Sequence, residues 1–174
     1  DPTKPYYKMY SVSNSRNCYE YADWTFLNVP AAELLEMGVE SLKHDTMFYF
    51  SADTDATAVM IGGIYDVALY DFGGAFGADL SMTKEEMIRS CEIKSAHAIA
   101  MAGVKLGEDG KPVKWLVENS FGEIRGWDGY VVMQNEWLET YLFRLVVERR
   151  FVPHKLVQML NQKPKVIPQW NPTY

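Results

Sequence analysis

The stretch "VKWLVENSFGEIRGW", Val113 to Trp127, decides how the rest of the chain is interpreted. It begins with the apolar residues of a buried strand and then breaks into Glu-Asn-Ser and a glycine-containing loop. A strand that only had to be buried would continue with apolar residues. The amide of Asn119, followed by an aromatic residue and a glycine, therefore indicates a hydrogen-bond acceptor that is fixed at the strand's end.

The preceding segment supplies the partner of this strand. The residues "AHAIAMAGV", 96–104, are typical of a strand, and "GEDG", 107–110, is typical of a hairpin turn. With ordinary hairpin loop lengths, position 97 lies across from positions 119–121, on the same face of the sheet as Asn119 and opposite or diagonal to it. Position 97 is a histidine. The spacing therefore predicts that His97 lies beside Asn119.

This pairing has a chemical use. An Asn side-chain oxygen that accepts the ring N–H of a histidine holds a general base in one tautomer and one orientation. We expect the ring of Phe121 to cover this hydrogen bond, and a neighbouring cysteine would be held as thiolate by the imidazolium. A histidine beside an asparagine on a sheet is also the pattern of a structural pair, so the spacing alone leaves both interpretations open.

The composition is that of one soluble globular domain, because 48% of the 174 residues are hydrophobic and 23% are charged. A net charge of −6 makes a nucleic-acid partner unlikely. Two cysteines, Cys18 and Cys91, form no disulfide framework, and no apolar run is long enough to span a membrane. The chain begins at Asp1 without an initiator Met or a signal peptide, which we interpret as a cut edge.

Helices are predicted at three places. One begins near Pro30 and runs through "AAELLEMGVESLK", the second is "TKEEMIRS" with a capping box of Thr83 and Glu86, and the third is "PHKLVQML". Glycine-rich residues 52–80 are predicted to form a long irregular surface loop. Within them, "DFGGAFGADL" lacks the lysine and the strand–helix context of a phosphate loop.

Further strands are predicted at "MFYFS" (47–51), "GYVVM" (129–133) and "YLFRLVVER" (141–149), the last following a short segment "NEWLET". Residues 1–28 are expected to be extended chain packed on a surface. The proline-containing tail from Asn161 onward is expected to hold little regular structure.

Two segments, "SAHAIAMAGV" and "VKWLVENSFGEIRGWDGYVVM", resemble the His and Asn segments of papain-like cysteine peptidases, in particular the bleomycin hydrolase/aminopeptidase C branch. The segments "NVPAAELLEM", "NEWLETYLFRLVV", "VPHKLVQMLNQKP" and "IPQWNP" resemble that branch in the same order. The resemblance implies an α+β, papain-like fold. Residues 1–174 would be its C-terminal, β-rich half, an antiparallel sheet or partial barrel with flanking helices.

The resemblance also implies residue roles. His97 matches the catalytic base and Asn119 the residue that orients it, while Phe121 stands where the family usually has Trp. The family's nucleophile is a cysteine at the start of a long helix, in a Gln…Cys-Gly-x-Cys-Trp context that neither Cys18 nor Cys91 matches. The nucleophile is therefore expected in an N-terminal half outside this chain, and the chain alone is expected to be inactive.

As a member of this branch, the protein is expected to be a cytoplasmic, cysteine-type aminopeptidase that needs no cofactor or metal ion. Peptides would be its substrates, and it would assemble into a homo-oligomer, as the family forms barrel-like hexamers, without a membrane partner. The tail, residues 164–172, is expected to run extended toward His97, held by its prolines, with Trp170 anchored on the sheet. In the family this end lies in the cleft and limits cleavage to the peptide's N-terminus.

The other two histidines are expected to have no catalytic role, with His44 capping a helix or facing solvent and His154 exposed. The sequence has no HExxH motif and no Cys/His spacing that would indicate a metal site. Two alternatives stay open. One is a papain-like domain that has lost catalysis and works as a binding or scaffold domain. A nucleophilic cysteine upstream of this chain would favour the peptidase over this alternative. The other is a structural β domain with an incidental pair, which a separation of His97 from Asn119 would support.

Overall fold

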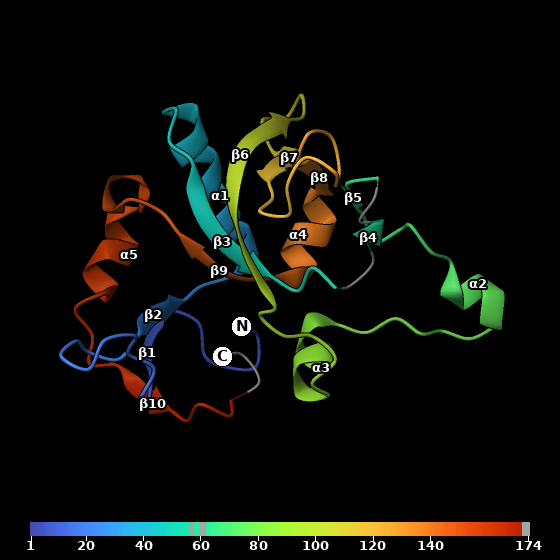
Figure 1. Ribbon diagram of the computed structural model, residues 1–174. Helices are drawn as coiled ribbons and strands as arrows, with labels where there is room; N and C mark the ends of the chain where they lie inside the picture. Colours follow the sequence, from blue (N-terminus) through green and yellow to red (C-terminus); the bar gives the residue numbers. More distant parts are fainter. Residues whose placement is uncertain (56–57, 60–61, 172–174) are drawn as a thin grey trace.

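The computed structural model describes residues 1–55, 58–59 and 62–171, which form a mixed α+β fold with a seven-stranded and a three-stranded sheet (Figure 1). In chain order the elements are β1 (Lys8–Val12), β2 (Thr25–Asn28), α1 (Ala31–Lys43), β3 (Phe48–Ala52), β4 (Ala58–Val59), β5 (Ile64–Tyr65), α2 (Phe72–Phe76), α3 (Lys84–Arg89), β6 (His97–Leu106), β7 (Pro112–Glu118), β8 (Tyr130–Gln134), α4 (Asn135–Tyr141), β9 (Leu142–Val146), a 3-10 turn η1 (Arg149–Phe151), α5 (His154–Met159) and β10 (Lys165–Ile167).

The large sheet is built around the predicted hairpin of β6 and β7. Its strand order is β4-β5-β8-β7-β6-β3-β9, and the hairpin is closed by a hydrogen bond of 2.8 Å from the Gly107 N–H to the Lys111 carbonyl. Neighbouring strands run antiparallel except β5 and β8, which are parallel. The expected antiparallel sheet is therefore confirmed around the hairpin, whereas its β5 edge is mixed.

Helices α1 and α4 supply the core that holds this sheet in place. Leu35 and Val39 of α1 and Trp137 and Leu138 of α4 are buried in one cluster with residues of β3, β6, β7 and β8. Helix α1 approaches β3 so closely that a Cβ added at Gly38 would lie 2.7 Å from the Phe48 ring. Burying each large apolar side chain contributes about 1.5–3 kcal/mol, so this cluster fixes the strands that carry the site.

Helix α3 leads the chain into β6 and is tied to the body of the protein. The predicted capping box of Thr83 and Glu86 is present. Lys84 donates from Nζ to the carbonyls of Glu139, at 2.8 Å, and Leu142, at 2.6 Å, at the end of α4. Burial lowers the pKa of Lys84 to about 8. These bonds anchor the segment that precedes His97.

The structure contains regular elements in two segments where the sequence predicted none. The segment "NEWLET" had no predicted structure and forms most of helix α4, whose buried Trp137, Leu138 and Tyr141 share one face. The loop 52–80 contains β4, β5 and α2, while its residues 56–57 and 60–61 lie outside the described part. A two-residue strand is too short to show an alternation of apolar and polar residues in the sequence. Only its pairing with neighbouring strands identifies it.

The tail also departs from expectation. Strand β10 pairs in parallel with β1, with Tyr10 opposite Lys165, so regular structure and not proline alone holds it. The side chain of Gln169 donates to the Asn14 carbonyl at 2.8 Å. Trp170 is 85% exposed, so its predicted role as an anchor on the sheet is wrong.

A long excursion carries α2 away from the body of the protein (Figure 1). The rings of Tyr70, Phe72 and Phe76 stack along it at centroid distances of 5.5 and 6.5 Å. The side chain of Asp71 accepts the Gly74 N–H and caps this short helix. The glycines thus form a capped helical turn and no phosphate loop.

Candidate active site

His97 and Asn119 are joined by a hydrogen bond of 3.0 Å between Nε2 and Oδ1. His97 is the first residue of β6, and Asn119 directly follows the last residue of β7. Ala100 lies opposite Glu118, so the same register puts Phe121 opposite His97 and Asn119 on the diagonal. The predicted juxtaposition is confirmed, with Asn119 one residue beyond the strand.

The surroundings of Asn119 determine which tautomer His97 adopts. The Ser120 N–H donates to Asn119 Oδ1 at 2.8 Å, so this atom is an acceptor and cannot be the amide nitrogen. The Asn119 N–H donates to the Gly129 carbonyl at 2.9 Å and holds the backbone. Nε2 of His97 must then carry the hydrogen, which leaves Nδ1 with its lone pair. Within the described residues, Nδ1 has no hydrogen-bond partner, so it is available to take a proton.

Strand β3 holds His97 from the other side. Ala52 pairs with His97 in the sheet, and the Ala96 N–H donates to the Ala52 carbonyl at 3.3 Å. The next residue, Asp53, is buried and accepts the Lys94 N–H at 2.9 Å through Oδ2. The backbone of His97 is therefore fixed by neighbours on both flanks, as a positioned base requires.

Phe121 covers the imidazole as predicted. Its ring is nearly parallel to that of His97, at 8°, with the ring centroids 5.0 Å apart. The guanidinium carbon of Arg125 lies 4.9 Å from the centroid of the Phe121 ring. Sequence reasoning did not identify Arg125, although an arginine four residues after an aromatic in a glycine-bounded loop is a usable signal.

The loop that carries Phe121 has little freedom at Gly126. This glycine has a φ of +69°, and a Cβ added there would lie 2.1 Å from the Tyr130 carbonyl oxygen. The Trp127 N–H donates to the same carbonyl at 2.9 Å. Ile124 and Trp127 are 88% and 82% exposed, so the loop presents apolar surface beside the pair.

Neither cysteine is placed as a nucleophile. Cys18 and Cys91 are both exposed. Cys91 follows the C-cap residue of α3, with a φ of +60°. The C-terminal end of a helix carries partial negative charge and disfavours a thiolate, which helix starts favour.

The other two histidines are where the sequence predicts them. His44 is the C-cap residue of α1, and His154 is the exposed first residue of α5. Among residues 1–55, 58–59 and 62–171, no three His, Cys, Asp or Glu side chains are grouped to hold a metal ion. The same residues contain no helix with the length and hydropathy that crossing a bilayer requires.

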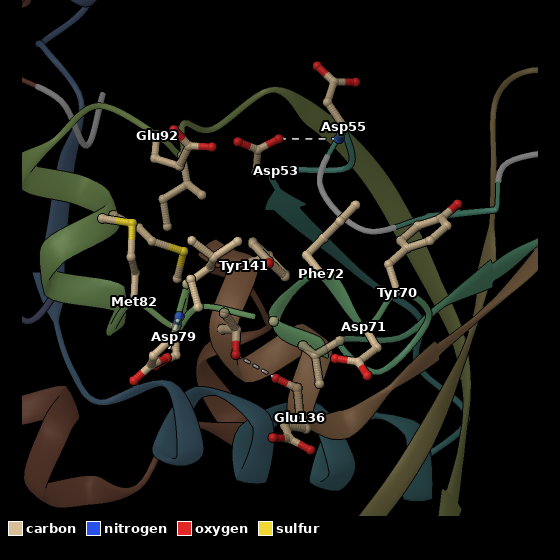
Figure 2. A pocket seen from close by; sticks show the side chains of 18 of the residues that line it. Asp53, Asp55, Tyr70, Asp71, Phe72, Asp79, Met82, Glu92, Glu136 and Tyr141 are labelled. Atoms are coloured by element: carbon tan, nitrogen blue, oxygen red, sulfur yellow. Dashed lines mark hydrogen bonds between the residues drawn. The ribbon is translucent and has the colours of Figure 1, made fainter. Parts of the chain in front are cut away.

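A cavity of about 920 Å³ is lined by Asp53, which follows the last residue of β3, by residues of the excursion around α2, and by Glu136 and Tyr141 of α4 (Figure 2). Six carboxylates line it, those of Asp53, Asp55, Asp71, Asp79, Glu92 and Glu136. Three of them serve the chain's own turns, since Asp53 accepts the Asp55 N–H, Asp71 caps α2 and Asp79 accepts the Ser81 N–H. Among the described residues that line the cavity, His97 and Asn119 do not occur, so it is a neighbour of the pair and not its site.

The sheet, its two packed helices and the histidine–asparagine pair across a hairpin define the class: the β-rich half of a papain-like fold. The sequence model of the Peptidase C1-like family matches residues 1–173. The chain therefore belongs to this family.

Similar proteins support the same placement. The chain is 33% identical to human bleomycin hydrolase over 174 residues, covering 98% of this chain and 38% of that protein. It is 28% identical to aminopeptidase C of Streptococcus thermophilus over 169 residues, covering 97% and 38%. The crystal structure of PepW from Lactobacillus rhamnosis HN001 (DR20) superposes with a TM-score of 0.93 at 30% identity, covering 98% and 39%. The chain thus spans about two fifths of the length of these relatives.

Proposed function

We propose that this chain is the part of a cysteine-type aminopeptidase that carries the base and its orienting residue. The observation that carries the proposal is the hydrogen bond between His97 Nε2 and Asn119 Oδ1, with Nδ1 left to accept a proton. The names of the relatives, bleomycin hydrolase and aminopeptidase C, support a peptidase that acts at peptide N-termini.

The first half of the reaction forms an acyl-enzyme. His97 Nδ1 takes the proton of a cysteine thiol, and the thiolate sulfur attacks the carbonyl carbon of the scissile peptide bond. When the tetrahedral intermediate collapses, the C–N bond breaks and His97 gives its proton to the leaving amine. Asn119 keeps Nε2–H bonded throughout, so that the imidazole does not rotate while Nδ1 gains and loses the proton.

The second half hydrolyses the thioester. A water molecule gives a proton to His97 Nδ1 and its oxygen attacks the thioester carbonyl. The C–S bond then breaks, the new carboxylic acid leaves, and His97 returns its proton to the sulfur. Each half therefore needs the same unprotonated Nδ1 at its start, which the bond to Asn119 provides.

We further propose that residues 1–174 are the C-terminal part of the peptidase domain and that an N-terminal half supplies the thiol. The coverage of 38% of the relatives and the exposed Ile124 and Trp127 support this division. The chain alone would then be inactive. By resemblance, peptides are its substrates, the full protein assembles into a homo-oligomer, and it works in the cytoplasm without a cofactor.

The proposal is tested by labelling with a peptidyl chloromethyl ketone. The isolated chain should not be labelled rapidly at Cys18 or Cys91, because neither has the surroundings of a nucleophile. The full-length protein should be labelled at one cysteine outside this chain, and His97→Ala should slow that labelling while His44→Ala should not. Rapid labelling of Cys91 or Cys18 that is lost in His97→Ala would place the nucleophile in this chain and overturn the division.

A catalytically dead papain-like binding or scaffold domain is the alternative. It has the same fold and the same paired side chains, but the full-length protein would lack a cysteine that reacts with the inhibitor. A separation of His97 from Asn119 would have supported the structural β domain with an incidental pair, whereas they are bonded at 3.0 Å.

The tail is proposed to limit cleavage to peptide N-termini. Strand β10 fixes residues 165–167 against β1, and the chain continues beyond Ile167 through Trp170. Deleting the residues after Ile167 in the full-length enzyme should release cleavage of N-terminally blocked peptides, because one end of the cleft would open. If blocked peptides stay intact while free-amino peptides are still trimmed one residue at a time, the tail does not have this role.

A further inference from the structure

The Phe121 side chain is 44% exposed, yet its ring is stacked nearly parallel to the imidazole of His97. A ring that is half in solvent is held only weakly by burial, because most of the free energy of burying a side chain comes from the area removed from water. Where the family usually has the two fused rings of Trp, this chain has one ring to cover the same histidine. Something other than burial must therefore keep Phe121 in this orientation.

Arg125 makes the contact that fits this need. Its guanidinium carbon lies 4.9 Å from the centroid of the Phe121 ring, within the range of a cation–π interaction. The planar guanidinium stacks on aromatic rings in a way that a lysine ammonium does not. At an exposed site such a contact changes the preference for one arrangement by about two- to fivefold.

The backbone of Arg125 is fixed between two turns, so the guanidinium is presented to the ring from a defined position. Its N–H donates to the Gly122 carbonyl at 3.5 Å, and Gly126 next to it is locked against the Tyr130 carbonyl. Burial raises the pKa of Tyr65 in β5, and the positive charge of Arg125 acts in the opposite direction. The guanidinium therefore lies within electrostatic reach of a buried strand residue.

We infer that Arg125 is a positioning residue, which holds the Phe121 ring flat against His97 and thereby keeps the imidazole in the plane where Nε2 meets Asn119. The inference rests on the proposed function, because positioning matters only if His97 is the base. Arg125 acts through Phe121 and touches no reacting atom. Its loss leaves the His97–Asn119 bond possible but lets the covering ring move away.

The spectroscopic test uses the full-length protein with ¹³C at histidine ε1, the His97 signal being assigned by its absence in His97→Gln. A stacked ring shifts the His97 ring proton upfield, and Phe121→Leu defines the position without it. Arg125→Gln should move the signal toward the Phe121→Leu position, and Arg125→Lys should move it less. Arg150→Gln is the matched control, since Arg150 lies 4.6 Å from the centroid of another ring, that of Phe151, and should leave the His97 signal unchanged.

The kinetic test follows hydrolysis of an aminoacyl-coumarin amide by the same variants. Arg125→Gln should lower kcat about two- to fivefold with KM unchanged, because the base is less often aligned while substrate contacts remain. In a Phe121→Trp background the same substitution should have a smaller effect, since the larger ring covers the imidazole without the arginine. Arg150→Gln should leave kcat unchanged.

The outcomes separate this inference from the proposed function. A His97 signal that stays at its wild-type position in Arg125→Gln overturns the role of Arg125, whatever the activity. A signal that moves while kcat stays at the wild-type value shows that Arg125 orders the ring without positioning the base, which also overturns it. Full activity in His97→Ala overturns the proposed function instead, and the signal of Arg125→Gln still reports on the ring contact.

Discussion

Two places in this protein bring an arginine, a phenylalanine and a histidine together, and they differ in what holds the phenylalanine. At the site, Phe121 is 44% exposed and stacks on His97 at 8°. At the end of α1, Phe151 is 7% exposed and lies beside His44 at a tilt of 40°, with the ring centroids 5.4 Å apart. Burial holds Phe151 in place, so the contacts that Arg150 and His44 make with its ring are not needed to orient it.

The two histidines also differ in how far along the chain their hydrogen-bond partners lie. His44 Nδ1 donates to the carbonyl of Glu40, one helical turn earlier, at 2.9 Å, as a residue at a helix end does. His97 binds the side chain of Asn119, which lies 22 residues away along the chain. The bond of His44 forms within one helical turn, whereas the bond of His97 requires the hairpin of β6 and β7 to form. Among the described residues, only the second arrangement joins a histidine to a side chain across paired strands and leaves its Nδ1 without a hydrogen-bond partner.

The strongest way to break the comparison is to remove each histidine from the full-length enzyme. His97→Ala should lower kcat/KM by about 10³-fold or more, because the general base is lost. His44→Ala should leave the rate within about twofold, since surface residues away from a site have small effects. Hydrolysis of an aminoacyl-coumarin amide measures both. Equal losses in the two variants would mean that the histidines do not differ in role.

The two phenylalanines should separate stability from activity. Phe151→Ala should lower the free energy of unfolding by about 3–5 kcal/mol, because it removes a buried ring and leaves a cavity. Phe121→Ala should cost about 1 kcal/mol or less, since nearly half of that ring is already in solvent. Urea unfolding of the chain, followed by circular dichroism, gives both values. A larger loss for Phe121→Ala would show that Phe121 is a core residue after all.

Removing the orienting side chain should have an intermediate effect. Asn119→Ala in the full-length enzyme should lower kcat about tenfold, because one hydrogen bond of roughly 0.5–1.5 kcal/mol no longer holds the tautomer. Asn119→Gln is the control: it keeps the amide, but its longer side chain displaces the oxygen from His97. The variant should therefore resemble Asn119→Ala. Wild-type kcat in both would show that Asn119 does not orient the base.

The smallest effect is expected at the helix end. Glu40 Oε1 lies 3.5 Å from His44 Nδ1, and both side chains are about half exposed. Glu40→Gln should change the free energy of unfolding by about 0.5 kcal/mol or less, because exposed ion pairs contribute little. It should leave kcat of the full-length enzyme unchanged. A drop in kcat would connect this helix end to the site and end the contrast with His97.

Much of this site could be predicted because a hairpin is local. The turn at 107–110 and the alternation on either side of it place His97 opposite or diagonal to Asn119 by counting alone, and the register of the sheet is the diagonal one. The ring of Phe121 follows from the same count. Arg125 escaped prediction because its role depends on how a glycine loop folds back, which Gly126 achieves through a close approach to the Tyr130 carbonyl.

Elements that depend on distant partners were predicted less well. Strand β10 was expected to be irregular, since three residues between prolines have no detectable period, yet β1 supplies the pairing edge from the other end of the chain. The two-residue strands β4 and β5 were missed for the same reason, because each is too short to show a period in the sequence. Helix α4 could have been predicted from the sequence, because Trp137, Leu138 and Tyr141 have helical spacing.

The sequence by itself determined the fold class, the hairpin, the helix starts at Pro30 and Thr83, and the pairing of His97 with Asn119. The hairpin, the helix starts and the pairing follow from spacing, capping and turn chemistry, which act over a few residues, whereas the fold class follows from the resemblance to papain-like peptidases. Only the tertiary structure decided that Ser120 fixes the acceptor of Asn119, that Arg125 lies over Phe121, and that β1 receives the tail. The first two contacts depend on how the loop after β7 folds back on itself, and the third on where the two ends of the chain meet in space, which the packing of the core sets.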